Sequence, residues 1–148
     1  MPISNIYINF IPMKKYIIIL VFSLFLINCS SKENREEAKK ITQTFYTLLK
    51  ENNRVEIFKL YGNELFKVAS KKQVNQMFDA SFAQFGNIKK DSLIYEQTNI
   101  IKGTHSKNEY ILIYNVNREI KNTQEKFTLH QQGDSIKIVG YFISPINN

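Results

Sequence analysis

The chain has 148 residues, of which 43% are hydrophobic and 13% aromatic, and its formal net charge is +7. This length and composition can bury the core of one ordinary globular domain. The basic residues are scattered among acids and amides, which is typical of a solvated surface and argues against nucleic-acid binding. The single cysteine, Cys29, excludes an internal disulfide, and without a Cys/His cluster we expect no metal and no cofactor.

The N-terminal segment has the pattern of a secretory signal. An uncharged, mostly apolar run from Tyr16 to Ile27 follows the basic pair Lys14-Lys15. The run is too short for a membrane-spanning helix, which needs about 20 apolar residues. A buried core helix is the alternative, and the lack of a polar face argues against it. We therefore expect residues 1–28 to be a signal peptide, and its true start is either Met1 or Met13.

The residues that close this run, Leu26-Ile27-Asn28-Cys29, resemble the lipobox of bacterial lipoproteins. In such proteins the cysteine sulfur carries diacylglycerol and the chain is cleaved just before the cysteine. Several acyl chains hold a protein on a bilayer far more firmly than one. The resemblance implies lipidation at Cys29, a lipidated tether over residues 29–35, and a location in the cell envelope, on the periplasmic face of the outer membrane. An inert buried thiol is the alternative for Cys29.

Three helices are predicted at the start of the remaining domain, residues 36–148, because apolar residues recur at intervals of three and four. Their apolar faces are Ala38, Ile41, Phe45, Leu48 and Leu49; then Val55, Phe58 and Tyr61; then Val74, Met77, Phe78, Phe82 and Phe85. Gly62 stops the second helix. The third begins at Ser70, with Gln73 at the spacing of a capping box, and ends at Gly86.

The second half of the domain alternates with the period of β-strands. Strands are expected at Leu93–Ile101, around Tyr110 to Val116, around Phe127 and Leu129, and at Ile136–Ile143. Short turns between them imply an antiparallel meander of about four strands. Helices followed by strands predict an α+β fold in which the N-terminal helices pack on one face of a bent sheet.

This order of elements resembles the cone-shaped fold of the nuclear transport factor two-like (cystatin-like) superfamily. The segments Phe85-Gly86-Asn87-Ile88 and Ile136 to Ile143 are similar to a bacterial member of it, domain of unknown function family 4019. The resemblance covers residues 36–145. It implies the cone fold and a periplasmic setting, and it supplies no catalytic residue.

Enzymes built on this cone use an Asp or His inside an apolar cavity as a general base. His105 lies in a predicted loop, and His130 follows the inward-facing Leu129 and should point outward. Asp79, Asp91 and Asp134 fall on a helix flank, beside lysines and in a turn, respectively. We therefore predict no catalytic residue.

The tyrosines are the more informative polar groups. Tyr95, Tyr110, Tyr114 and Tyr141 could place hydroxyls around the concave face and orient a ligand, although buried tyrosines usually bond within their own protein. We expect a membrane-anchored, non-enzymatic module that binds a small apolar molecule or a protein partner. A small hydrolase or isomerase using the cavity, and a structural envelope component, are the alternatives. A homodimer through an apolar patch around Ile111 and Ile113 stays open.

Overall fold

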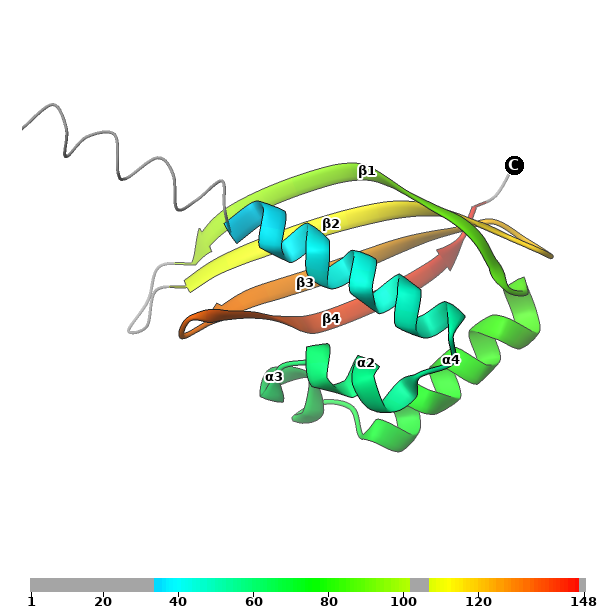
Figure 1. Ribbon diagram of the computed structural model, residues 1–148, viewed down its shortest axis with the longest axis horizontal. Coiled ribbons are helices and arrows are strands. Elements are labelled where there is room, and N and C mark those ends of the chain that lie inside the picture. The colour runs from blue at the N-terminus through cyan, green and yellow to red at the C-terminus, as the bar shows by residue number, and fades with distance from the viewer. Residues whose placement is uncertain (1–33, 102–106, 147–148) are drawn as a thin grey trace, which may run out of the picture. The chain divides into compact units, whose positions relative to one another are not determined.

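The computed structural model describes residues 34–101 and 107–146, which form one α+β unit (Figure 1). A helix over residues 34–50 comes first, followed by α2 (Arg54–Leu60), α3 (Asn63–Phe66) and α4 (Lys71–Phe85). Four strands follow: β1 (Ile88–Ile101), β2 (Lys107–Arg118), β3 (Thr123–Gln132) and β4 (Ser135–Pro145). They pair antiparallel in chain order, and the helices pack against this sheet. The predicted α+β fold and the four-strand meander are confirmed.

The ends of α4 follow the predicted chemistry. The Ser70 hydroxyl accepts a hydrogen bond from the Gln73 backbone, and the Gln73 side chain accepts one from the Ser70 backbone. This reciprocal pair satisfies donors that the first helical turn leaves open. At the other end Gly86 has φ 79°, a left-handed value that a residue with a side chain rarely adopts, and its N–H bonds the Phe82 carbonyl.

The apolar face of α2 differs from the prediction. Val55 is 69% exposed, whereas Ile57 is completely buried. The helix begins at Arg54, with the Asn53 side chain accepting from the Glu56 backbone, and this start turns Val55 outward. Tyr61 lies beyond the helix in extended backbone, where it forms a bridge to Ile138 at the edge of β4. The one-turn helix α3 was not predicted, because four residues are too few for a helical period.

The strands present one apolar face to the helices. On β2 the buried residues are Tyr110, Leu112, Tyr114 and Val116, in the predicted alternation. Phe127 and Leu129 on β3 pair with members of that set and are completely buried. β1 begins at Ile88, five residues earlier than predicted, because Lys89 to Ser92 are all polar and carry no alternating signal.

Phe45 of the first helix occupies the middle of the core. Its ring lies 4.9–6.3 Å, centre to centre, from five other rings. Those rings are Tyr46, Tyr61, Phe78, Phe127 and Tyr141. Most of these pairs meet edge-on or tilted, the arrangements that aromatic quadrupoles favour. Three of the five are tyrosines, so the core contains hydroxyls that need partners.

Candidate functional site

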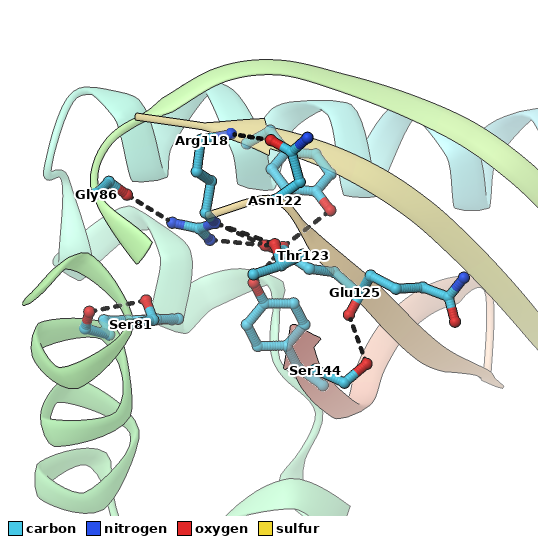
Figure 2. Close-up of polar contacts among 11 residues, drawn as sticks. Ser81, Gly86, Arg118, Asn122, Thr123, Glu125 and Ser144 are labelled. Carbon is cyan, nitrogen blue, oxygen red and sulfur yellow. Dashed lines mark hydrogen bonds and ion pairs between the residues drawn. The ribbon is translucent and has the colours of Figure 1, made fainter. Parts of the chain in front are cut away.

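A charged pair lies in the interior of the domain. Glu125 has the same parity on β3 as Phe127, so its side chain enters the core, and Arg118 reaches it from the end of β2. The Arg118 Nη2 and Glu125 Oε1 atoms are 2.6 Å apart, and both side chains are fully buried. Figure 2 shows the guanidinium between the Gly86 carbonyl, which accepts from Nη1 at 3.1 Å, and the Thr123–Glu125 pair. The polar atoms of the pair therefore have protein partners in place of water.

Five hydrogen bonds converge on the Glu125 carboxylate. Oε1 accepts from Arg118 Nε, Arg118 Nη2 and Thr123 Oγ1, and Oε2 accepts from the hydroxyls of Tyr46 and Tyr141. Burial, and next the Glu125 charge, raise the pKa of Tyr46 and of Tyr141 well above the ordinary phenol value, so both remain donors. A carboxylate whose two oxygens already accept five hydrogen bonds is fixed in place, which suits a structural role better than that of a general base.

The remaining core tyrosines differ in how they are satisfied. Tyr114 shares a 2.6 Å hydrogen bond with the Thr42 hydroxyl of the first helix, and burial raises its pKa. The buried hydroxyls of Tyr61 and Tyr110 have no hydrogen-bond partner within residues 34–101 and 107–146. An unsatisfied buried hydroxyl is costly and calls for an explanation, such as a bound molecule or strain tolerated elsewhere.

An apolar cavity of about 120 Å³ lies between α3, α4 and β4. Its lining consists of Tyr61, Leu65, Ala69, Gln73, Val74, Met77 and Tyr141. Tyr141 therefore has two roles: its ring borders the cavity and its hydroxyl donates to Glu125. Gln73 caps the first turn of α4 and also lines the cavity.

The four tyrosines predicted for a ligand site are not brought together. Tyr110, Tyr114 and Tyr141 lie on the helix-facing side of the sheet, and of the four only Tyr141 lines this cavity. Tyr95 pairs with Ile113, which belongs to the opposite face, and is 47% exposed. Its hydroxyl donates to Gln97 on the same strand.

His130 is buried and lies between two carboxylates. It follows Leu129 on β3 and pairs with Glu109, so its side chain leaves the strand on the side opposite to that of Leu129. Its Nδ1 is 2.7 Å from Glu64 Oε2 of α3, and its Nε2 is 3.1 Å from Glu109 Oε2. Burial alone would raise the pKa of Glu109, but hydrogen bonds with His130 and Asn99 outweigh it, and that pKa lies below its ordinary value. The cluster joins α3 to the sheet.

The aspartates that we considered as bases have ordinary surface roles. Asp79 forms an ion pair with Arg54 at 2.9 Å, and Asp91 forms one with Lys50 at 2.8 Å. Asp134 is exposed in the turn before β4. His105 and the predicted lipidation site Cys29 lie outside the described residues.

Glu125 is an inward-facing carboxylate that we did not predict from the sequence. The signal was available: Thr123, Glu125, Phe127 and Leu129 are spaced by two, so an inward Phe127 places Glu125 on the same face. Its partner Arg118 ends the preceding strand, with only a short turn between them. A basic residue and an acid of inward parity on either side of a turn could have indicated a buried pair.

The described part of the chain contains no group of three or more His, Cys, Asp or Glu side chains placed to hold a metal. Nor does any helix in residues 34–101 and 107–146 have the length and hydropathy to cross a membrane. Comparison with protein-family models found no match, and comparisons with curated proteins and with solved structures found none either.

Proposed function

We propose that this protein is a membrane-anchored envelope lipoprotein whose α+β domain binds a small apolar molecule without transforming it. The observation that carries the proposal is the apolar cavity between α3, α4 and β4. Ligand pockets are typically concave and apolar, with a few polar groups that fix orientation. Here aliphatic and aromatic side chains form most of the wall, and Gln73 is also part of the lining.

The size of the cavity limits the ligand. A protein cavity of about 150 Å³ lined by aliphatic and aromatic residues stays dry and takes up benzene. The present cavity, about 120 Å³, suits a single small ring or a short branched chain. Tyr141 borders the cavity, and its hydroxyl donates a hydrogen bond to Glu125. Burial raises the pKa of this hydroxyl, which favours ligand binding over proton transfer at this residue.

The anchor and the family are part of the same proposal. The charged pair Lys14-Lys15, the apolar run after it and Cys29 support a lipoprotein signal. The order of helices followed by a four-strand antiparallel meander supports membership of the nuclear transport factor two-like superfamily, and within it of domain of unknown function family 4019. The competing proposal is a protein partner or a second copy of the chain that binds the outer face of the sheet. Tyr95 and Phe142, which are 47% and 64% exposed on that face around Ile113, would form the contact.

Toluene is a suitable first probe, because it is apolar and close to the cavity in size. We expect it to raise the melting temperature of the wild-type protein, since a ligand that binds only the folded state stabilises that state. Ala69→Leu adds three carbons to a residue of the cavity wall and should abolish the toluene effect. Native mass spectrometry of the protein purified from its own envelope would then identify the retained molecule.

The matched control is Ala80→Leu, the same substitution on the exposed side of α4. It should leave the toluene effect unchanged. A wild-type protein whose melting temperature does not respond to toluene, or an equal loss in both variants, would contradict the cavity as the binding site.

A further inference from the structure

The first helix fixes which end of the domain carries the N-terminal tether. Lys39 Nζ lies 2.6 Å from Glu96 Oε2, and Lys50 Nζ lies 2.8 Å from Asp91 Oδ1. As the helix advances from 39 to 50, its contacts on β1 therefore move back from 96 to 91, and helix and strand run in opposite directions. Asn34 precedes Lys39 by about 7 Å of helix axis. It therefore lies beyond Glu96, toward the end of β1, where Figure 1 shows the helix start beside the β1 arrowhead.

This end of β1 exposes two isoleucines. Ile100 is 68% exposed and Ile101 is 36% exposed. The residues leading to them, Glu96 to Asn99, are polar and separate this pair from the exposed apolar residues Leu93, Ile94 and Tyr95 earlier on the strand. Adjacent strand residues point to opposite faces, and β1 is an edge strand, so both faces of the strand end present an isoleucine.

The tether is short. Counting from the sequence, Asn34 is five residues after Cys29. Even fully extended, five residues span at most about 18 Å. If Cys29 carries the anchor, as the proposed function holds, Asn34 cannot move further than this from the lipid surface, and the end of β1 is held near the bilayer with it.

We propose that Ile100 and Ile101 contact the lipid surface, so that the anchored domain meets the bilayer with this end of the sheet. The inference rests on the proposed anchor and adds an orientation to it. The surface that covers the two isoleucines is the bilayer interface, because the tether keeps that surface within reach. Burying apolar side chains there is favourable, since it removes them from water. The opposite end of the sheet, with Ile120 in the turn after β2, faces away.

The chain contains no tryptophan, so one introduced indole reports on one position. Ile100→Trp and the matched control Ile120→Trp replace isoleucines of nearly equal exposure, 68% and 67%, at opposite ends of the sheet. Each full-length, lipidated variant is reconstituted into phosphatidylcholine vesicles with and without bromine on the acyl chains. We expect blue-shifted emission that bromine quenches by at least half for Ile100→Trp, and neither effect for Ile120→Trp. Ile101→Trp provides a second reading at the same end.

The outcomes separate the orientation from the anchor. If the protein floats with vesicles but the Ile100→Trp and Ile101→Trp emissions are not quenched, the orientation is wrong while the anchor stands. A blue shift without quenching means that protein, not lipid, covers the isoleucines, and it also overturns the inference. If the wild type carries no acyl mass at Cys29 and does not float, the proposed anchor fails and the orientation fails with it.

Discussion

Glu125 and Arg118 illustrate the condition under which a charged pair is tolerated in a protein core. Removing two charges from water is expensive, and their mutual attraction offsets this only when the remaining polar atoms are also bonded. Here Gly86, Thr123, Tyr46 and Tyr141 supply those bonds. The pair also joins α4, which ends at Gly86, to the turn between β2 and β3.

Neutralising one member of this pair should be severely destabilising. Glu125→Gln leaves the Arg118 charge buried without a counter-charge, and breaking such a pair costs about 3–5 kcal/mol. Urea denaturation followed by circular dichroism measures the loss. The control is Glu51→Gln on an exposed residue, for which we expect a change within about 0.5 kcal/mol. A Glu125→Gln cost equal to that of the control would show that the Glu125 carboxylate does not stabilise the buried pair.

Glu109 should make stability depend on pH in a defined direction. Its pKa is lower in the folded protein than its ordinary value, so the folded state binds this proton less readily than the unfolded state. Its contribution is therefore complete above the ordinary glutamate pKa of about 4.3, and it is lost as pH falls through the folded value. Urea midpoints of the wild type should drop more between about pH 6 and pH 3 than those of Glu109→Gln. Parallel curves for the two proteins would contradict this account.

At the scale of elements, long periodic segments were predictable and short or edge segments were not. The cap and face of α4 follow from Ser70, Gln73 and the apolar spacing, and the inward face of β2 follows from strict alternation. The helix α3 has one turn, and the first half of β1 has mostly exposed side chains, so neither shows a periodic spacing of apolar residues in the sequence. Their conformations depend on contacts that the local sequence does not record.

The candidate site was less predictable than the fold for a related reason. Alternation places Tyr110 and Tyr114 on the inner face, but it does not indicate that Tyr114 meets Thr42 or that Tyr141 meets Glu125. These pairs join residues 72 and 16 positions apart. Tyr114 meets Thr42 only when the first helix packs on the sheet, and Tyr141 meets Glu125 only when β3 and β4 pair. The cavity depends on α3, the element that the sequence did not reveal.

The apolar face of α4 can be tested by truncating two of its rings. Phe78 is completely buried beside Phe45, whereas Phe82, predicted to lie in the core, is only partly buried. Phe78→Ala should cost about 3–5 kcal/mol, the usual range for a buried ring. Phe82→Ala should cost less, because part of its surface is already in water. Urea denaturation of both variants gives the order, and a larger loss for Phe82→Ala would show that the helix face is rotated.

At the scale of the whole molecule, the folded core and the proposed anchor belong to separate parts of the chain. The core described between Ala38 and Ile138 draws its buried side chains from the helices and strands of one unit. The proposed anchor at Cys29 precedes that unit. Removing the thiol should therefore change the covalent state of the chain and its membrane attachment but not the stability of the domain.

Cys29→Ala tests this separation. Without the sulfur no diacylglycerol can be attached, and a lipoprotein peptidase that requires the lipidated cysteine should leave the preceding residues in place. Intact-mass measurement should find acyl chains on a wild-type chain that begins at Cys29, and an unacylated, longer chain in the variant. The urea midpoint of the domain should agree in the two proteins, because none of the buried core residues is altered. A wild-type protein that is recovered without detergent and carries no acyl mass would refute the anchor, whereas an acylated protein whose domain is destabilised by the substitution would refute the separation of anchor and core.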